Sequence, residues 1–406
     1  MVDLIILPMH DWKKCQKEGF RTRDGHFMEH FCRSPGIGKI LVVDRPVSLA
    51  ESLLRRRGGP IEGGRLVLRG RDFWLTEAVP DKCYVLDMST GEILRPLLLG
   101  RDWWDHVFRK ARVHAVIREA AEHLGLKEPV LFLWSPLSTG VLDAVPHSLL
   151  VFDALDNWLN HPIIRDKRGL IAAGYRMIRQ NADLIFTNTP SIAEFLSPAA
   201  KCAPRYVPNG VDPERFARKS LPLPADMRGL PRPIIGYTGK ITRRHDLELC
   251  RKLLAGFPDC SFVFCGPVLE KGWIRGLMRH PNLHYLGDKH YNDLPAYVSH
   301  FDVAIIPYDT VRHRIEGEAI KLYEYLAAGL PVVTSRFMGV DAFAAHVWIA
   351  DNHGEFLKHV QTCVELARAG RPDEIGRKVA GALPESVSWA VKAELMLDSI
   401  RRKLEG

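Results

Sequence analysis

The chain has 406 residues and a formal charge of +8, and 46% of its residues are apolar. This composition excludes a disordered or collagen-like chain, the length suits two domains with a core each, and no run approaches the ~18 apolar residues of a membrane-spanning helix. The positive charge permits an anionic partner such as a nucleotide-sugar, a nucleic acid or lipid headgroups, but a diffuse surplus is equally typical of a solvated surface.

We expect no signal peptide at the start of this sequence. The apolar run Leu4–Leu7 is interrupted by Pro8, and it lacks the basic flank and small-residue cleavage site of a signal peptide. We therefore expect a cytoplasmic protein, with the inner face of the plasma membrane as an alternative location. The eight cysteines are scattered without zinc-finger spacing, so we expect reduced thiols and no metal site.

Short runs rich in Val, Ile and Leu alternate with helical patterns, which predicts an α/β chain with mainly parallel sheets. Strands are expected near residues 3–8, 39–44, 65–69, 83–87, 130–134, 149–153, 183–187 and 204–207. The prolines of residues 220–233 predict a linker. A second series of strands follows near 234–238, 261–265, 283–286, 302–306, 331–334 and 347–350, and then a terminal helix near 389–404.

Residues 315–334 are the most informative segment, because they read as a loop, a helix, a stop and a strand. Gly329 lies where a left-handed residue ends a helix, and Pro331 follows two residues later. The helix is apolar except for Lys321 and Glu324, and a carboxylate on such a helix is costly without a partner. That partner is either Lys321, as a helix-surface pair, or a ligand hydroxyl group.

The first turn of the same helix offers a second kind of contact. Its free N–H groups, near Glu318, Ala319 and Ile320, favour a phosphate group. In parallel sheets of this kind, ligands bind at the carboxyl ends of the strands. A phosphate-bearing ligand is therefore expected near this turn.

Glu316 and Glu324 form a Glu-x7-Glu pair ahead of Tyr-Leu-Ala-Ala-Gly-Leu-Pro-Val-Val. This pattern resembles the donor-site signature of retaining GT-B-fold glycosyltransferases of the glycosyltransferase family 4 type. Further segments resemble that family in order and spacing over residues 180–406: Val207–Phe216, Ile235–Gly239, Phe262–Pro267, Leu283–Gly287, Leu294–Tyr297, Phe301–Pro307 and Ser388–Trp389. In outline the chain resembles teichuronic-acid and other envelope-polysaccharide glycosyltransferases.

The resemblance implies a GT-B fold, in which two doubly wound Rossmann-like domains face a central cleft. Residues 1–212 would bind the acceptor, together with a helix over 389–406 that crosses back, and residues 213–388 would bind the nucleotide-sugar. The implied enzyme is a hexosyltransferase that moves a sugar, with retention of configuration, to a saccharide or lipid-linked saccharide in envelope polysaccharide or glycan synthesis. Front-face displacement needs positioning and fixed cations rather than a protein nucleophile. Because no Asp-x-Asp motif is present, we expect neither a metal nor another cofactor.

The resemblance also assigns donor-side roles. Glu324 would hold the ribose and Glu316 the transferred sugar, with Glu318 as the alternative to Glu316. Gly239 would let the backbone approach the pyrophosphate. The remaining donor-side candidates are the cations Lys240, Arg243 and Arg244, whose alternative is a solvated loop, and the contacts Gly266, Pro267, Gly317, Ala319 and Ile320.

Acceptor-side candidates follow two strands of the first half. Beyond the first strand and the segment Met9–Trp12 lie the candidates Arg23, Asp24, Gly25 and His26, with His26 also a candidate catalytic group and a structural role as the alternative. Asp153 and Asp156 end another strand and would orient acceptor hydroxyl groups. For Asp156 the alternative is a helix cap.

A basic, aromatic surface on the first half would suit peripheral contact with a membrane that carries a lipid-linked acceptor. An ordinary core helix with basic outer residues is the alternative. The residues concerned are Trp103, Trp104, Phe108, Arg109, Lys110, Arg112 and Arg55–Arg57. Rival functions are a nucleotide-sugar 2-epimerase and a non-catalytic glycosyltransferase-like scaffold. No nucleic-acid partner is expected, since no recognition motif accompanies the basic residues.

Overall fold

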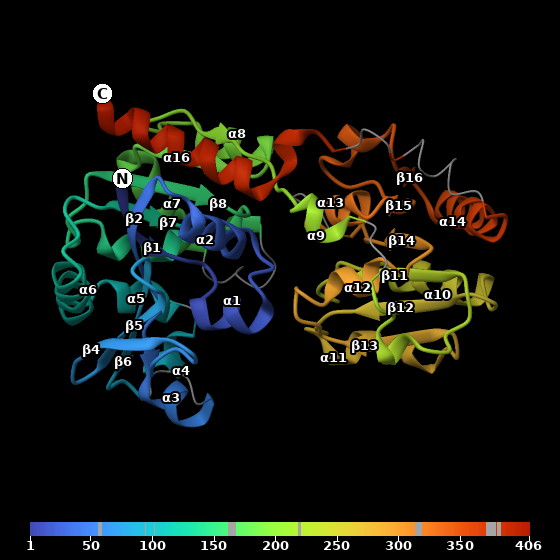
Figure 1. Ribbon diagram of the computed structural model, residues 1–406, viewed down its shortest axis with the longest axis horizontal. Helices are drawn as coiled ribbons and strands as arrows, with labels where there is room; N and C mark the ends of the chain where they lie inside the picture. The colour runs from blue at the N-terminus through green and yellow to red at the C-terminus, as the bar shows by residue number, and fades with distance from the viewer. Residues whose placement is uncertain are drawn as a thin grey trace. The chain divides into compact units, whose positions relative to one another are not determined.

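The structure is a computed structural model that describes residues 1–55, 59–93, 95–100, 102–160, 168–217, 221–312, 319–370, 379 and 383–406. The chain forms two compact units. The first unit comprises Met1–Pro208 and Ala393–Gly406, and the second comprises Asn209–Lys392 (Figure 1). Each unit is an α/β domain built on its own sheet, as the alternating pattern predicts.

The sheet of the first unit has the strand order β10-β9-β8-β7-β1-β2-β6-β5-β4, with β3 beside β6. Its strands are β1 (Val2–Leu7), β2 (Ile37–Val43), β3 (Val47–Ser48), β4 (Arg65–Arg69), β5 (Phe73–Val79), β6 (Cys83–Thr90), β7 (Val130–Leu133), β8 (Leu149–Ala154), β9 (Leu184–Thr187) and β10 (Arg205–Tyr206). The strands from β10 to β6 are parallel, whereas β5 runs antiparallel to β4 and β6.

The helices of the first unit surround this sheet. They are α1 (Trp12–Glu18), α2 (Arg23–Arg33), α3 (Leu49–Arg55), α4 (Arg95–Leu99), α5 (Asp102–Phe108), α6 (Ala111–His123), α7 (Arg168–Asn181), α8 (Pro190–Leu196) and most of α16 (Trp389–Glu405). The 3-10 turns η1 (Pro136–Val141) and η2 (Trp158–Asn160) follow β7 and β8. The central strands are buried on both faces: Ile5 and Leu7 join one core, while Leu4 and Ile6 are buried opposite.

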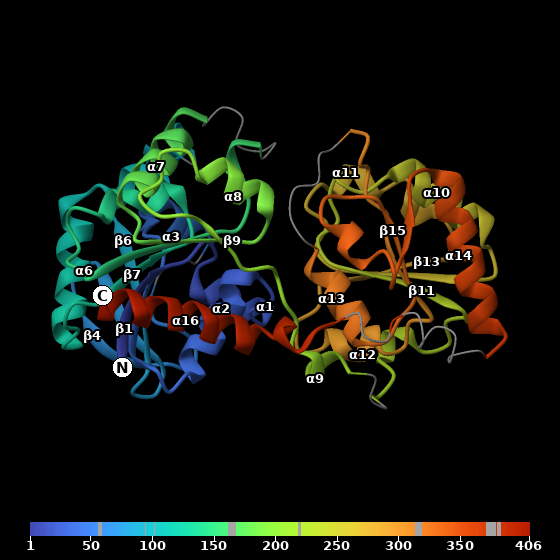
Figure 2. The same ribbon diagram turned by 90° about the horizontal axis from the view of Figure 1, so that it is seen from above.

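The terminal helix α16 packs on the first unit, where it runs alongside α2 (Figure 2). Ser34 Oγ donates a hydrogen bond to Glu394 Oε1 at 2.6 Å, and Arg205 Nη1 donates one to Ser399 Oγ at 2.9 Å. The predicted terminal helix is therefore confirmed, and its carboxyl-terminal part belongs to the first unit although the chain has already passed through the second.

The second unit has the strand order β13-β12-β11-β14-β15-β16, and each neighbouring pair in this order is parallel. Its strands are β11 (Ile234–Thr238), β12 (Ser261–Cys265), β13 (Leu283–Gly287), β14 (Val303–Ile306), β15 (Val332–Ser335) and β16 (Trp348–Ala350). Its helices include α9 (Pro213–Phe216), α10 (Leu247–Gly256), α11 (Lys271–Ile274), α12 (Leu294–Val298), α13 (Ile320–Ala327) and α14 (His353–Arg368). Phe262 and Phe264 of β12 point into one core and Val263 and Cys265 into the other.

The helix α13 begins and ends as its sequence predicts. Gly329 adopts a left-handed φ of 67°, and the N–H groups of Gly329 and Leu330 donate to the carbonyl oxygens of Leu326 and Tyr325 at 2.9 and 3.0 Å. Pro331 then leads into β15. This turn therefore joins the end of α13 to the amino end of β15.

Two sequence-based predictions are corrected. The proline-rich segment is not a linker in its described part, residues 221–233, because it lies within the second unit and buries Met227 to 1% exposure. Strand β5 was not predicted. It is the returning arm of a hairpin and includes Thr76 and Glu77, so it does not show the continuous apolar run of its parallel neighbours.

Each sheet has one switch point, where strands that come later in the chain are added on the opposite side of the first strand. In the first unit this switch point lies between β1 and β7, and in the second it lies between β11 and β14. The loops that leave the two adjacent strands there move apart in opposite directions, which opens a crevice at the carboxyl edge. We therefore expect binding residues at these two edges.

Candidate functional site

At the switch point of the second unit, Gly239 and Gly266 end β11 and β12 side by side. Their φ angles are 124° and 143°, a range that strongly favours glycine. A Cβ on Gly266 would lie 2.0 Å from the carbonyl oxygen of Gly239, so a side chain there would collide with the backbone. The sequence therefore leaves bare backbone at the strand ends.

Lys321 of α13 lies directly against this bare backbone. A Cβ on Gly239 would be 2.8 Å from Lys321 Cε and 3.2 Å from Nζ. The Nζ donates a hydrogen bond to the hydroxyl of Tyr308, just after β14, at 2.8 Å. It also lies 5.3 and 5.4 Å from the ring centroids of Tyr237 and Tyr308. A cation is thus held at the switch point by residues from both adjacent strands.

Glu324, one turn further along α13, is only 5% exposed. Burial raises the pKa of Glu324 to about 7, against the opposing effects of a hydrogen bond from Tyr291 and the positive charges of Lys321 and Arg215. The Arg215 guanidinium lies 5.1 Å from the Tyr291 ring centroid. Glu324 therefore interacts with Tyr291, in the loop before α12, and with the charge of Arg215, in α9. It does not form only a helix-surface pair with Lys321.

Buried aromatic and imidazole groups hold this edge in place. Tyr325 Oη receives the N–H of Thr238 at 2.7 Å and fixes the end of β11. His245 packs edge-on against Tyr237 with ring centroids 4.7 Å apart. Burial, together with the charges of Lys321 and Arg244, lowers the pKa of His245 to about 3, so this imidazole stays neutral at physiological pH.

The predicted basic trio lies in the loop after β11. Arg243 is 74% exposed, and its Nε lies 3.3 Å from Glu270 Oε2. Lys240 is exposed and Arg244 is half-buried. The Lys240 carbonyl accepts from Tyr237 Oη at 3.0 Å, which ties this loop to the strand. Among the described cations named here, Lys321 is the one whose side chain lies against the Cβ position of Gly239.

Other donor-side candidates are placed as follows. Pro267 accepts a hydrogen bond from the Ile241 N–H at 2.9 Å, which joins the loops after β11 and β12. Ala319 is the residue before α13 and Ile320 is its first residue. Glu316, Gly317 and Glu318 lie outside the described residues.

In the first unit, two acceptor-side candidates bond to each other. Arg23 Nε and Nη2 donate to the two carboxylate oxygens of Asp153 at 2.9 Å each, and Trp134 Nε1 donates to Oδ2 at 2.8 Å. The side chains of Arg23 and Asp153 are 4% and 0% exposed. Their paired groups are therefore turned to each other inside the unit.

Asp24, the second residue of α2, is buried and binds a residue that the sequence analysis did not select. Its carboxylate accepts from the backbone N–H and from Nδ1 of His10, in the loop after β1. His10 was overlooked because nothing in the sequence brings positions 10 and 24 together. Lys321 was noted only as a possible partner of Glu324, although its place on an otherwise apolar helix was the available signal.

The other acceptor-side candidates take the following positions. A Cβ on Gly25 would lie 2.9 Å from the Phe20 carbonyl oxygen, so the absent side chain makes room for the protein's own backbone. His26 is buried within α2. Asp156 accepts from Tyr175 Oη through its backbone carbonyl, and the N–H of Leu159 is bound by Asn157 rather than by Asp156.

The aromatic residues of α5 are core residues, which matches the alternative to a membrane-facing surface. Trp103 and Phe108 are 1% and 4% exposed. The basic residues around them pair with carboxylates: Arg109 with Asp105, Lys110 with Glu92 and Arg112 with Asp72. The side chains of Arg55–Arg57 lie outside the described residues. None of the helices in the described part of the chain is both long and apolar enough to cross a membrane.

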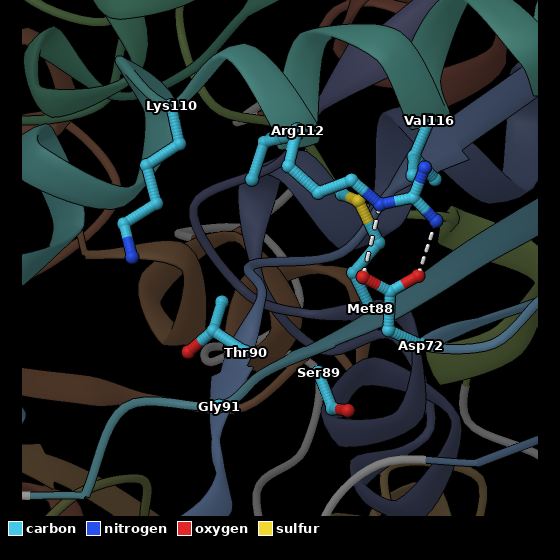
Figure 3. Close-up of a pocket in the computed structure, with 9 residues that line it drawn as sticks. Asp72, Met88, Ser89, Thr90, Gly91, Lys110, Arg112 and Val116 are labelled. Atoms are coloured by element: carbon cyan, nitrogen blue, oxygen red, sulfur yellow. Dashed lines mark hydrogen bonds and ion pairs between the residues drawn. The ribbon is translucent and has the colours of Figure 1, made fainter.

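A cavity of about 220 Å³ lies in the first unit, between the end of β6 and the start of α6. Figure 3 shows Arg112 and Asp72 turned toward each other at its wall. Since Lys110 is also paired, both cations of the lining are already neutralised by the protein. The cavity lies at β6, two strands away from the switch point.

Comparison with known proteins identifies both the fold and a domain. A family model described as glycosyl transferases group 1 matches residues 229–355. A putative teichuronic acid biosynthesis glycosyltransferase, TuaH of Bacillus subtilis, is 26% identical over 196 residues, or 45% of this chain. That match spans about half, 49%, of the relative's length.

Solved structures match along the whole chain at low identity. Sucrose-phosphate synthase from Thermosynechococcus elongatus has a TM-score of 0.69 at 15% identity and covers 99% of both chains. Anabaena HepE, in complex with UDP and glucose, has a TM-score of 0.65 at 12% identity and covers 100% of both chains. The predicted GT-B fold of two Rossmann-like domains is thereby confirmed.

Proposed function

Because residues 229–355 form a domain of the group 1 glycosyl transferases, we propose that this protein transfers a sugar from a nucleotide-sugar, bound at the switch point of the second unit, to a hydroxyl group of a saccharide or lipid-linked saccharide. Residues 213–388 are the donor-binding domain in this proposal. Residues 1–212, with 389–406, bind the acceptor. The observation that carries the proposal is the contact between Lys321 and the bare backbone at Gly239.

The diphosphate of the donor occupies the space beside Gly239 and Gly266. A phosphate needs unobstructed backbone and a nearby cation, and this edge offers both. Lys321 comes from the first turn of α13, where the positive end of the helix dipole adds to its charge. Lys321 therefore stabilises the charge that builds on the departing diphosphate, with Lys240, Arg243 and Arg244 further out in the loop.

The ribose binds to Glu324. An ionised carboxylate accepts hydrogen bonds from two neighbouring hydroxyl groups, and the buried position of Glu324 strengthens such bonds. Because the pKa of Glu324 lies at about 7, nucleotide binding favours the ionised form and tightens as the pH rises through 7. Glu316 remains the proposed contact of the transferred sugar, on the family resemblance.

The finer features of the reaction rest on the same resemblance. We propose that a hexose is transferred with retention of configuration, by front-face displacement in which the proton of the attacking hydroxyl passes to the departing diphosphate oxygen. No metal takes part in this proposal. Lys321 supplies positive charge where a metal ion would otherwise do so. The name of TuaH points to envelope polysaccharide as the product class, and a second HepE structure, in complex with UDP-glucose, makes UDP-glucose the first donor to test.

The direct test is thermal stabilisation by nucleoside diphosphates and nucleotide-sugars, with and without EDTA, on the wild type and on Lys321→Met. Loss of a charged hydrogen bond of about 1.5–3 kcal/mol weakens binding about 10- to 100-fold, so the variant should lose most of the shift. EDTA should leave the wild-type shift unchanged.

Lys252→Met is the matched control, since Lys252 is an exposed lysine of the same unit on α10. The control should bind like the wild type. If no nucleotide stabilises the wild type, the proposed function is wrong. An equal shift in the wild type and in Lys321→Met would instead remove Lys321 from the site.

A further inference from the structure

His10 and Asp24 form a hydrogen-bonded pair at the carboxyl edge of the first sheet. The two carboxylate oxygens of Asp24 lie 3.0 and 3.1 Å from His10 Nδ1, and the His10 backbone N–H donates to Oδ2 at 2.8 Å. Thr22 Oγ1 donates to Oδ1 at 2.6 Å. Three donors thus hold one carboxylate, and that carboxylate holds the imidazole in one orientation.

Asp24 is ionised although its side chain is 0% exposed. Burial alone would raise the pKa of this carboxyl, but the charge and the hydrogen bonds of His10, with the hydroxyl of Thr22, hold the pKa at about 2. Its position in the first turn of α2 adds the favourable end of the helix dipole. A carboxylate in this state can only accept hydrogen bonds.

The ionised Asp24 decides which nitrogen of His10 carries the proton. Nδ1 must donate, so Nε2 carries the lone pair when the ring is neutral and a second N–H when the ring is protonated. The His10 side chain is 16% exposed. Within the described part of the chain, no residue is bonded to Nε2, and this atom is not among the buried unpaired ones. Nε2 is therefore a hydrogen-bonding group of fixed direction that solvent can reach.

The pair lies where a ligand of this sheet is expected. His10 follows β1 by three residues, and β1 and β7 are the strands on either side of the switch point of the first unit. Two nearby carboxylates accept hydrogen bonds from backbone N–H groups. Asp11 Oδ1 accepts from the N–H of Arg45, and Asp44 Oδ1 accepts from the N–H of Trp12, so these bonds join the loops after β1 and β2. Among these three residues of the loops after β1 and β2, His10 is the one whose ring nitrogen Nε2 is both exposed to solvent and held in one direction.

We propose that His10 Nε2 binds a hydroxyl group of the saccharide acceptor, with Asp24 as the residue that positions it. A saccharide hydroxyl group can donate or accept a hydrogen bond, so an oriented ring nitrogen is a suitable partner for one in either protonation state. The role of the saccharide as acceptor rests on the proposed function. The bound hydroxyl is distinct from the attacking one, so no proton is transferred to His10 and its effect is on acceptor affinity.

Two substitutions separate this role from a structural one. His10→Asn keeps an amide donor near the position of Nδ1 for Asp24 but has no acceptor at Nε2. His10→Gln places an amide oxygen near Nε2. Acceptor KM is measured with p-nitrophenyl hexosides and the nucleotide-sugar that stabilises the wild type. We expect His10→Asn to raise this KM about tenfold, His10→Gln to restore part of the affinity, and kcat and donor affinity to be unchanged.

Asp24→Asn tests the positioning role. It should raise acceptor KM and leave kcat and the Kd of the nucleoside diphosphate unchanged. His123→Asn is the control for histidine replacement, because His123 is exposed on α6, and it should leave all three values unchanged. An unchanged acceptor KM in His10→Asn overturns the proposal, provided that the thermal unfolding midpoint shows the variant to be folded.

A measurement without donor keeps this proposal independent of the proposed function. Diethyl pyrocarbonate acylates an accessible imidazole nitrogen, and peptide mass mapping reports the modification of His10 and of His123. We expect the mixed p-nitrophenyl hexosides to slow the modification of His10 but not of His123. Equal modification of His10 with and without the saccharides overturns the proposal, whether or not a nucleotide binds. Absence of nucleotide binding with His10 protected would overturn only the donor assignment.

Discussion

Glu324 shows how burial at a single residue couples protonation to stability. Its carboxyl group is 5% exposed, and its pKa lies at about 7 in place of an ordinary value near 4.5. The folded protein therefore binds a proton between these two values that the unfolded chain has released. Stability is greatest below the lower value and falls as the pH rises toward 7.

Glu324→Gln should remove this dependence. The shift corresponds to about 3 kcal/mol, so relative to the wild type the variant should gain about that much stability between pH 5 and pH 8. Urea unfolding at both pH values measures the difference. Glu365→Gln, at an exposed position of α14, is the control and should give the same difference from wild type at both. A pH-independent difference for Glu324→Gln would show that its carboxyl titrates normally.

The Arg23–Asp153 pair is a second effect at the residue scale. Asp153→Asn leaves the buried guanidinium of Arg23 without its counter-charge, and breaking a buried pair in this way costs about 3–5 kcal/mol. Asp105→Asn removes the partner of Arg109, which is 52% exposed, and should cost less than about 1 kcal/mol. Chemical denaturation compares the two. Similar losses would mean that the Arg23 pair is solvated.

At the scale of elements, the end of helix α13 and the end of strand β12 both require glycine, but for different reasons. Gly329 ends α13 at a φ of 67° with nothing within 4 Å of a built Cβ, so only backbone strain opposes a side chain. At Gly266 the same strain is joined by a collision with the Gly239 carbonyl oxygen. The helix end and the strand end are thus glycine-dependent to different degrees.

Alanine substitutions at Gly329 and Gly266 should distinguish the cost of backbone strain from the cost of a steric collision. We expect Gly329→Ala to cost about 1 kcal/mol and leave nucleotide binding intact. Gly266→Ala should cost more and weaken nucleotide binding, because the Gly239 backbone must move. Unfolding midpoints and nucleoside diphosphate affinities give both quantities. Equal losses in the two variants would mean that the strand ends have room to adjust.

Most elements of the second unit were predictable because β11, β12 and β14 are short apolar runs and α13 carries its own stop signal. β5 was not, since its place as an antiparallel neighbour of β6 is set by the hairpin rather than by an apolar run. The proline-rich segment was misread as a linker because prolines report local backbone restriction and not which unit the chain packs on.

For the whole molecule, the chain order and the packing order differ. The carboxyl-terminal part of α16 packs on the first unit, although its residues follow those of the second unit in the chain. Each unit has its own sheet and its own switch point. A donor and an acceptor would therefore be bound by separately built edges.

Hydrogen exchange should show this division of roles. With the nucleoside diphosphate that stabilises the protein, exchange should slow at the end of β11 and in α13 (Ile320–Ala327), where we propose that the diphosphate and ribose bind. Residues of β1 and α2 should be unaffected. Mass spectrometry of proteolytic fragments measures both regions in one experiment. Protection of β1 and α2 alone would reverse the assignment of the two domains.

The sequence by itself determined the α/β class, the two-domain organisation and the stop at Gly329, and it made Glu324 a candidate, because periodicity, turn residues and a lone carboxylate on an apolar helix are local signals. Only the tertiary structure decided which groups meet. Lys321 reaches Gly239 across 82 positions of sequence, and His10, before α1, meets Asp24, after α1. These contacts depend on the order of strands at the switch points, and no local pattern encodes that order.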